Sequence, residues 1–300
     1  NAGTYPVTVT ITPKNPNAGL PALAKNATVE IGKKQIALQV SEINKTYDAV
    51  ASSLIVSLPV GAAATAADEA AILGGVEFRW NNQVIANSFT NAGTTNVTVS
   101  ASNDNYEIAS AQTTVRIAKR PITLTADTID VFYDEQPHTA GYTYTVAQYD
   151  GAGALTNNSG LLNLHTLTAN LNDNVRTNVC NEAPVTFAEG LTTILQGTIS
   201  VLNNYDITYV KGSITIRRAR VLTLSLQDYV GIYDAQAHGV TLQSVKEGQR
   251  NIDLNRFTWY YGTAADTVNQ TSLTFTNVVD QLVYVKGVSI DGNYPDVTGT

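Results

Sequence analysis

Three stretches of this chain resemble one another, and this internal repeat limits the folds that the chain can adopt. They read TVEIGKKQIALQV from Thr28, TVRIAKRPITLTA from Thr114 and SITIRRARVLTLS from Ser213. Each stretch alternates apolar and polar residues, passes a short basic joint and alternates again, which is the pattern of two strands joined end to end. Self-similarity at a nearly fixed period predicts a tandem series of similar modules.

Two residue pairs recur in the same order within each copy. A Tyr-Asp pair follows the basic joint, and an Asn-Tyr pair comes near the end of the copy. We expect the ring of each Tyr-Asp tyrosine to pack inward and the aspartate to cap a turn by accepting backbone N–H bonds. The pairs are Tyr47-Asp48, Tyr133-Asp134 and Tyr233-Asp234, then Asn105-Tyr106, Asn204-Tyr205 and Asn293-Tyr294.

A Phe-x-Trp pattern occurs in two of the copies, with its tryptophans at Trp80 and Trp259. Residues two apart on a strand point to the same face of the sheet, so we expect both pairs to be core aromatics. Tyr260 and Tyr261 follow the second tryptophan and cannot both point inward. One of them is expected to face solvent, where it could contact a ligand.

The repeated marks divide the chain into modules. Residues 1–31 are predicted to be the C-terminal strands of a preceding module, because NAGTYPVTVTI at the start matches NAGTTNVTVSA from Asn91. Residues 32–118 are predicted to form a β-sandwich module, and residues 119–217 a second one with a longer insertion. Residues 218–300 are predicted to form a third module that lacks its last strand.

Short strands separated by turn signals such as NAG, NDN and DGN predict an all-β fold. We expect tandem immunoglobulin-like antiparallel β-sandwich modules in an elongated array. Residues 53–60 are interpreted as a buried strand. The Ala-rich stretch 62–73 is interpreted as a connection that contains one helical turn.

The composition argues against several functions. Charged residues make up 14% of the chain and the formal net charge is -7, whereas a nucleic-acid surface would need clustered Lys and Arg. Three His, one Cys and no Met leave little material for catalysis or metal binding.

The uncharged run 49–67 contains Pro59 and Gly61, so it would make a poor membrane-spanning helix and no membrane insertion is expected. Cys180 has no partner for a disulfide and is expected to be a small buried side chain. The chain begins without an initiator Met or a leader, which suggests a mature product or a piece of a longer protein.

The sequences KTYDA, VFYDE and GIYDAQAHGV, together with NYDITYVKGSITIRRA, resemble the MBG/YDG-type modules of large bacterial surface adhesins. In that family a Tyr-Asp-Gly opens the module, and an Asn-Tyr-x-Ile and a Gly-x-Ile-x-Ile strand close it. Here the third residue of the opening motif is Ala49, Glu135 or Ala235 rather than Gly, which leaves the geometry of the turn open. The resemblance implies an extracellular location on a bacterial cell surface, and no catalytic residues.

An aspartate and a histidine stand four residues apart at Asp134 and His138, and again at Asp234 and His238. Such a pair could begin a metal or acid/base site. The first copy has Ser52 at the histidine position, and no third ligand or orienting partner is evident. We therefore interpret the Tyr-Asp motif as structural and expect neither an enzyme nor a required cofactor.

Calcium is the one metal that the sequence suggests at all. Asp104, Asp173 and Asp291 lie in Asp- and Asn-rich loops near module ends, where calcium could stiffen a joint. Asn-Asp-Asn runs are also ordinary turn chemistry, and we favour that interpretation.

Two functions remain from the sequence. The first is a non-catalytic structural repeat of a bacterial surface fibre, stalk or lattice. Its partners would be neighbouring copies of itself or adjacent modules, possibly by head-to-tail completion of a module by residues 1–31. The alternative is an adhesin module that binds a host glycan or matrix protein through its loops, with Tyr260 and Tyr261 as the candidate contacts.

Overall fold

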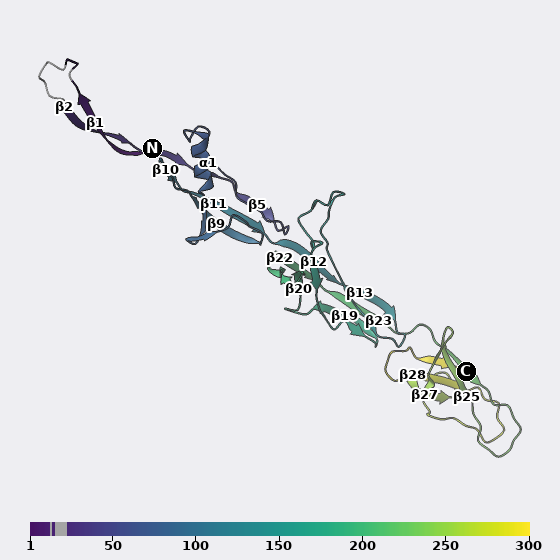
Figure 1. Ribbon diagram of the computed structural model, residues 1–300. Helices are drawn as coiled ribbons and strands as arrows, with labels where there is room; N and C mark the ends of the chain where they lie inside the picture. Colours follow the sequence, from purple (N-terminus) through teal and green to yellow (C-terminus); the bar gives the residue numbers. More distant parts are fainter. Residues whose placement is uncertain (13, 16–22) are drawn as a thin grey trace. The chain divides into compact units, whose positions relative to one another are not determined.

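The computed structural model describes residues 1–12, 14–15 and 23–300, and most of its regular structure is β-strand (Figure 1). The fold is all-β, which confirms the predicted fold class. The tandem immunoglobulin-like arrangement stays a prediction.

The strands are, in chain order, β1 (Gly3–Ile11), β2 (Leu23–Ile31), β3 (Lys34–Ala37), β4 (Gln39–Val40), β5 (Ile43–Thr46), β6 (Val56–Ser57), β7 (Glu77–Trp80), β8 (Gln83–Ile85), β9 (Gly93–Ser100), β10 (Tyr106–Ala109), β11 (Ala111–Ala118), β12 (Arg120–Ala126), β13 (Thr128–Phe132), β14 (His138–Thr139) and β15 (Tyr142–Tyr144). They continue with β16 (Thr166–Thr168), β17 (Leu171–Asn172), β18 (Val175–Arg176), β19 (Cys180–Phe187), β20 (Thr193–Gln196), β21 (Ile199–Ser200), β22 (Tyr205–Val210), β23 (Gly212–Arg217), β24 (Thr223–Gln227), β25 (Thr241–Glu247), β26 (Arg250–Ile252), β27 (Phe257–Gly262), β28 (Tyr284–Ser289) and β29 (Val297–Gly299). The helices are α1 (Ala66–Gly74) and the short 3-10 helices η2 (Leu202–Asn204) and η3 (Leu254–Arg256).

The chain forms two compact units, and each draws strands from more than one predicted module. The predicted module boundaries stay a prediction. The first unit contains residues 1–122, 146–166 and 195–206, and the second contains residues 123–145, 167–194 and 207–300.

The main sheet of the first unit has the strand order β5-β11-β9-β7-β8. Strand β11 lies parallel to β5, with Val115 opposite Ile43, and antiparallel to β9 on its other side. Its alternating apolar residues Val115 and Ile117 are buried. Because β11 fills the place between two strands that come earlier in the chain, we call it a closing strand.

The second unit repeats this arrangement in a sheet of order β13-β23-β19-β17. Strand β23 lies parallel to β13, with Ile214 opposite Ile129, and antiparallel to β19. Ile214 and Ile216 are fully buried. Strand β23 is thus the closing strand of its module, and two copies of the sequence repeat fold in the same way.

Strand β2 carries the first copy of the repeated stretch, but it forms only a hairpin. It pairs with β1 through all nine of its residues, from Leu23 opposite Ile11 to Ile31 opposite Gly3. Every residue of both strands is exposed. The sequence of a closing strand is therefore present here without the parallel partner and the core that surround β11 and β23.

The third predicted module contains two antiparallel three-stranded sheets, of order β24-β25-β26 and β27-β28-β29. Phe257 at the start of β27 is buried, and Trp259 is half-buried. The indole N–H of Trp259 donates to the carbonyl oxygen of Leu254 at 3.0 Å, and the ring packs against Phe257. The core role expected for this Phe-x-Trp pair fits these contacts.

The same expectation is wrong for Trp80, whose side chain is 48% exposed. Trp80 is the last residue of β7 and stands directly before a tight turn at Asn81 and Asn82, which both have positive φ. The ring therefore lies at the end of the sheet, where the strand leaves it, rather than in the interior. Phe78, two residues earlier, is half-buried.

The segment between β5 and β7 also differs from its prediction. Helix α1 spans nine residues rather than one turn, and Thr65 caps it by accepting the backbone N–H of Asp68 at 3.1 Å. Ile72 anchors the helix as a fully buried side chain. Residues 53–60 contain only the two-residue strand β6, and Ile55 in their middle is exposed, so the predicted buried strand is wrong. No helix among the described residues is long and apolar enough to cross a membrane.

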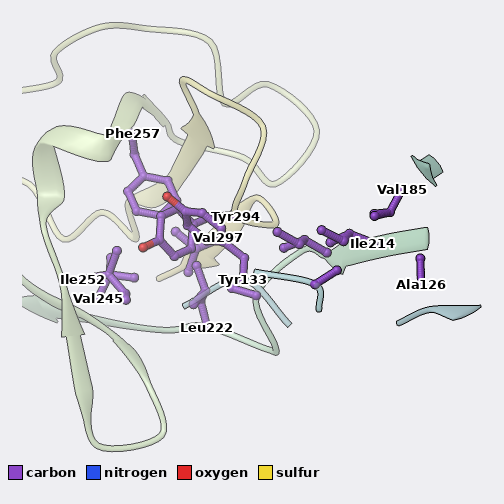
Figure 2. Packing of buried hydrophobic residues seen from close by; sticks show 13 residues of the cluster. Ala126, Tyr133, Val185, Ile214, Leu222, Val245, Ile252, Phe257, Tyr294 and Val297 are labelled. Atoms are coloured by element: carbon purple, nitrogen blue, oxygen red, sulfur yellow. The ribbon is translucent and has the colours of Figure 1, made fainter. Parts of the chain in front are cut away.

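One apolar cluster joins the second and third predicted modules within the second unit (Figure 2). Figure 2 shows the rings of Tyr133 and Tyr294 at its centre, between Ile214 on one side and Val245 on the other. A continuous core means that the two modules bury apolar surface together at their junction. Its members are Ala126, Tyr133, Ala140, Val185, Ile214, Ile216, Ala219, Leu222, Val245, Ile252, Phe257, Tyr294 and Val297.

The closing strand should therefore be sensitive to truncation. We expect Ile214→Ala to lower the free energy of unfolding of the second unit by about 3 kcal/mol, because it leaves a cavity in a packed core. Ile290→Ala, at a residue that is 66% exposed, is the matched control and should change it by less than about 0.5 kcal/mol. Urea denaturation followed by tryptophan fluorescence measures both. Equal effects of the two substitutions would contradict the assigned core.

Candidate functional site

The Tyr-Asp motif forms the same turn in all three copies. The aspartate Oδ1 accepts the backbone N–H two residues later at 2.9 Å, from Val50, Gln136 and Gln236 in turn. The backbone of the third motif residue has the left-handed conformation in every copy, with φ of 62° at Ala49, 68° at Glu135 and 63° at Ala235. This is the conformation that glycine favours. The turn keeps the backbone shape that a Tyr-Asp-Gly motif would give, although none of the three residues is glycine.

His138 and His238 contact the aspartates of this turn. His138 Nε2 lies 3.0 Å from Asp134 Oδ1, and His238 Nε2 lies 3.0 Å from Asp234 Oδ1. The N–H of Gln136 is the main cause that lowers the pKa of Asp134, and the hydrogen bond from His138 adds to it. For Asp234 the hydrogen bond from His238 is the main cause of the lowered pKa. These are exposed turn contacts, and among the described residues no three His, Cys, Asp or Glu side chains gather where they could hold a metal ion.

In the second unit, Asn293 of an Asn-Tyr pair reaches across to the residues just before β19. The backbone N–H of Val179 donates to Asn293 Oδ1 at 2.8 Å, and Asn293 Nδ2 donates to Asn178 Oδ1 at 3.1 Å. The backbone N–H of Ala219 donates to the Asn293 carbonyl at 3.2 Å. The Asn293 side chain is buried, so these bonds fix its place. Residues of the second and third predicted modules are thereby tied together.

The tyrosines of the two motifs meet at the same place. Tyr133 and Tyr294 pack edge to face, with ring centroids 5.1 Å apart and an interplanar angle of 84°. Both rings are buried, and this burial is the main cause that raises the pKa of each hydroxyl. The Tyr294 hydroxyl also donates a hydrogen bond to Glu135. We call this combination of a buried asparagine amide and two tyrosine rings the joint.

The first unit contains a second joint with the same geometry. The N–H of Ala92 donates to Asn204 Oδ1 at 2.8 Å, and Asn204 Nδ2 donates to Asn91 Oδ1 at 3.1 Å. Tyr47 packs edge to face on Tyr205 with ring centroids 5.8 Å apart. Both distances that involve the asparagine equal those at Asn293. The residues that meet come from the first and second predicted modules.

His165 lies within this second joint. Its Nδ1 lies 2.6 Å from the Tyr205 hydroxyl, and its ring stacks on Tyr47 at 6.0 Å. Burial is the main cause that lowers the pKa of His165 and raises that of Tyr205 to about 12. The backbone N–H of Leu162 donates to the same hydroxyl. His165 therefore takes the position at Tyr205 that Glu135 takes at Tyr294.

Arg120 is fully buried beside the second joint. Its guanidinium donates to the carbonyl oxygens of Gly160, Ser159 and Asn157, at 2.6 to 3.0 Å, and more weakly to that of Tyr47. Burial is the main cause that lowers its pKa. This contact ties the insertion of the second predicted module to the Tyr-Asp motif of the first.

A third set of the asparagine bonds occurs at the start of the chain. The N–H of Ala2 donates to Asn105 Oδ1 at 2.8 Å, and Asn105 Nδ2 donates to Asn1 Oδ1 at 3.4 Å. The N–H of Lys34 donates to the Asn105 carbonyl at 3.0 Å, as Ala219 does at Asn293. The tyrosine beside it, Tyr106, is buried.

The asparagines that receive these bonds were not recognised as site residues in the sequence. Asn1, Asn91 and Asn178 each stand two residues before a strand, which is also where turn asparagines are common. The available signal was their position, since each precedes the antiparallel partner of a closing strand or of β2. Asn277 holds the same position in the third predicted module.

At Asn277 the joint is open. Tyr233 of the third Tyr-Asp motif is 64% exposed, so the expectation that it packs inward is wrong. The reason is that no Asn-Tyr pair among the described residues lies against it. Residues 228–234 and 275–283 instead line a groove of about 510 Å³. We call it the open groove.

The other residues predicted as sites, namely the ligand, calcium and cysteine candidates, lie outside the joints. Tyr260 and Tyr261 are both half-buried in β27, and their role as ligand contacts stays a prediction. Asp173 pairs with Arg176, and Asp291 accepts the N–H of Asn293 while facing Arg256 at 3.7 Å. Asp104, the third calcium candidate, lies in the loop before β10. Cys180 is half-buried and its thiol donates to the carbonyl of Ile214.

No family model matches this sequence, and no curated protein matches it. Among solved structures, the chain is similar to SGBP-B of the mixed-linkage glucan utilization locus of Bacteroides ovatus, in complex with a mixed-linkage heptasaccharide. The match covers 97% of this chain and 76% of that chain, at 7% identity and a TM-score of 0.16. A TM-score this low does not indicate a shared fold.

The joint asparagine should contribute strongly to stability. We expect Asn204→Ala to lower the free energy of unfolding of the first unit by about 2 kcal/mol, because the N–H of Ala92 loses its buried acceptor. Its neighbour Asn203 is exposed, and Asn203→Ala is the control with an expected change below about 0.5 kcal/mol. Thermal and urea denaturation measure the difference. Similar values for the two variants would rule out the assigned role of the amide.

The tyrosine of the joint should make stability depend on alkaline pH. The pKa of Tyr205 is about 12 in the folded chain and about 10 when unfolded, so the unfolded chain loses this proton first as the pH rises. The stabilisation is therefore fully present below about pH 10 and is lost as the pH approaches about 12. We expect Tyr205→Phe to flatten this fall in a series of urea unfolding curves. An unchanged slope would contradict the assignment.

Proposed function

We propose that this chain is a non-catalytic structural segment of an extracellular bacterial surface protein, in which successive β-modules are locked to one another by the joint. The observation that carries the proposal is the recurrence of the asparagine bonds at Asn105, Asn204 and Asn293, with nearly constant distances. An active site needs to be present only once in a chain. A coupling device gains from being repeated at every junction.

The chemistry of the joint suits coupling. A primary amide offers one acceptor and two donors in a fixed plane, and each joint amide bonds both a backbone N–H and a second amide. A buried amide that lost these partners would cost free energy, so a displaced neighbour is disfavoured. The edge-to-face tyrosines add apolar contact beside the hydrogen bonds. Successive modules are therefore held by directional bonds and not by burial alone.

The Tyr-Asp motif also supports a structural role, because its turn recurs in every copy. Its aspartate is used by the turn in every copy, and the histidine is absent from the first copy, where Ser52 stands. The surface location rests on the resemblance to MBG/YDG-type modules and on the low charge and single cysteine of the chain. Adhesion to a glycan through Tyr260 and Tyr261 has less support, because both rings are half-buried.

Trypsin tests the proposal, because Lys119, Arg217 and Arg218 place cleavage sites at the module boundaries. We expect the double variant Asn204→Ala with Asn293→Ala to be cut at these boundaries about tenfold faster than the wild type, since loosened joints open more often. Asn203→Ala should be cut at the wild-type rate. Mass spectrometry of timed digests identifies the sites.

Two results would overturn the proposal. One is boundary cleavage at equal rates in the wild type and the double variant. The other is saturable binding to a glycan array that Tyr260→Ala with Tyr261→Ala abolishes, which would support the adhesin function instead.

A further inference from the structure

Among the described residues, one buried side-chain nitrogen or oxygen has no hydrogen-bond partner, and it is Nε2 of His165. The residue is 6% exposed and lies inside the second joint. Its ring stacks on Tyr47, and its other nitrogen, Nδ1, lies 2.6 Å from the Tyr205 hydroxyl. Buried polar atoms are almost always paired in native proteins, so an unpaired one calls for a physical reason.

The Tyr205 hydroxyl determines which form of the imidazole fits. It accepts the backbone N–H of Leu162 at 3.3 Å, and among the described residues its own proton has one acceptor, His165 Nδ1. Burial raises the pKa of Tyr205 to about 12, so the phenol keeps its proton at neutral and acidic pH. We therefore assign the proton of this hydrogen bond to Tyr205 and the proton of the neutral imidazole to Nε2.

A second proton on His165 conflicts with this bond. It would occupy Nδ1 and meet the hydroxyl proton of Tyr205, because both atoms would then be donors. The hydroxyl would have to turn away and would lose the one acceptor that the described residues give it. Tyr205 directly follows Asn204, so a displaced ring would also disturb the amide that accepts the N–H of Ala92.

The contacts of the ring offer no compensation for a positive charge. They are the ring of Tyr47, the ring and hydroxyl of Tyr205, and the side chain of Gln196. Burial lowers the pKa of His165 and Gln196 opposes this, but Gln196 makes no hydrogen bond that satisfies Nε2. Within the described part of the chain no carboxylate pairs with His165, unlike the histidines of the two Tyr-Asp turns.

Arg120 already places a positive charge beside this cluster. It is fully buried, and its guanidinium donates to the Tyr47 carbonyl at 3.5 Å. Burial raises the pKa of the Tyr205 hydroxyl and the charge of Arg120 opposes this rise, so the cation acts at the ring that bonds His165. A second cation in the same interior is disfavoured by both burial and repulsion.

The acidic side chains on the neighbouring elements are paired or face elsewhere. Asp48 of the Tyr-Asp turn pairs with Lys45 at 2.7 Å. Asp206 in β22 is exposed, since successive residues of a strand point to opposite faces. The hydroxyl of Tyr149, in the insertion, bonds the side chain of Asn163 at 3.1 Å. In the described structure the joint therefore fits the neutral imidazole only.

We propose that the second joint is an acid-sensitive contact, in which protonation of His165 breaks its bond with Tyr205 and releases the amide of Asn204. The proposal rests on the proposed function, because it adds a condition under which the coupling of the first and second predicted modules is released. At the other two sets of asparagine bonds, the tyrosine hydroxyl meets the N–H of Ala64 or the carboxylate of Glu135. Neither partner is a base that becomes a cation in acid, so one junction opens while the others hold.

The direction of the pH dependence follows from burial. Burial lowers the pKa of His165 below the ordinary value of about 6.5, so the opened joint binds the proton more readily than the closed one. The stabilisation is fully present above about pH 6.5 and is lost as the pH falls toward the lowered pKa. At pH 5, about 1.5 units below the ordinary pKa, the open form gains up to about 30-fold in population.

Amide hydrogen exchange, followed by NMR on the intact chain at pH 7.5 and pH 5, tests the proposal. The reporter is the N–H of Ala92, which Asn204 accepts at 2.8 Å. After correction for the intrinsic exchange rate at each pH, we expect its protection to fall between about threefold and about 30-fold at pH 5. The N–H of Val179, which Asn293 accepts at 2.8 Å, is the internal control and should change by less than about twofold.

Two variants isolate the histidine. His165→Asn keeps an acceptor near the position of Nδ1 but cannot take up a proton, so it should remove the acid response of Ala92. His138→Asn is the matched control, because it removes a histidine from a Tyr-Asp turn, and it should respond as the wild type does. An NMR titration of the wild type with ¹³C-labelled histidine measures the protonation of His165 directly and does not depend on the folding of either variant.

The outcomes separate this proposal from the proposed function. An equal loss of protection at Ala92 and Val179 would overturn the acid sensitivity, as would a full acid response in His165→Asn. A His165 ring that becomes charged at or above pH 6.5 while the joint stays protected would do the same. The trypsin experiment on Asn204 and Asn293 is run near pH 8, where His165 is neutral, so its result is independent. If it fails while Ala92 responds to acid, the bond is acid-sensitive without holding the modules together.

Discussion

The proposed coupling of neighbouring modules depends on one interaction, a buried asparagine amide that bonds to the backbone of an earlier repeat. Amides are costly to bury unless their hydrogen bonds are made, and Asn204 and Asn293 make them to a backbone N–H and to a second asparagine. Such bonds tolerate little displacement. The apolar packing around each amide, with one tyrosine from each motif, is less directional and can adapt. The amide therefore supplies directional bonds, and the rings add apolar contact beside it.

The tyrosine of each Asn-Tyr pair is buried, but the partner of its hydroxyl differs from one copy to the next. The Tyr106 hydroxyl accepts the N–H of Ala64 at 2.8 Å, the Tyr205 hydroxyl lies against His165, and the Tyr294 hydroxyl donates to Glu135. These partners come from a helix-containing connection, an insertion and a turn residue. A buried hydroxyl needs a partner but does not specify which one. Repeats can therefore differ in their loops while the contact that joins them stays the same.

The sequence was sufficient for the features that one repeat determines alone. Alternation predicted the closing strands, and the Tyr-Asp turn forms even though Ala49, Glu135 and Ala235 replace glycine. It was insufficient where a residue depends on its neighbour. Tyr233 reads like Tyr133 in the sequence but is exposed, because burial requires an Asn-Tyr pair from another module. Asn91 and Asn178 read as ordinary turn residues, since nothing local distinguishes an asparagine that receives an amide. Trp80 was misplaced because the alternation of a strand does not reveal where its sheet stops.

Arg120 gives a physical reason for the longer insertion of the second predicted module. It is a fully buried cation, and its hydrogen bonds within the described residues end on carbonyl oxygens, most of them in the insertion at 157–160. Lys34 and Ala219 hold the same place in the other copies, where Lys34 is exposed and donates to the Gly61 carbonyl at 3.4 Å, and Ala219 carries no charge. The carbonyl oxygens of the loop at 157–160 therefore take the place of water around the guanidinium of Arg120. A shorter loop would leave that buried charge without hydrogen-bond acceptors, so this loop can be shortened without loss of stability only if Arg120 is replaced as well.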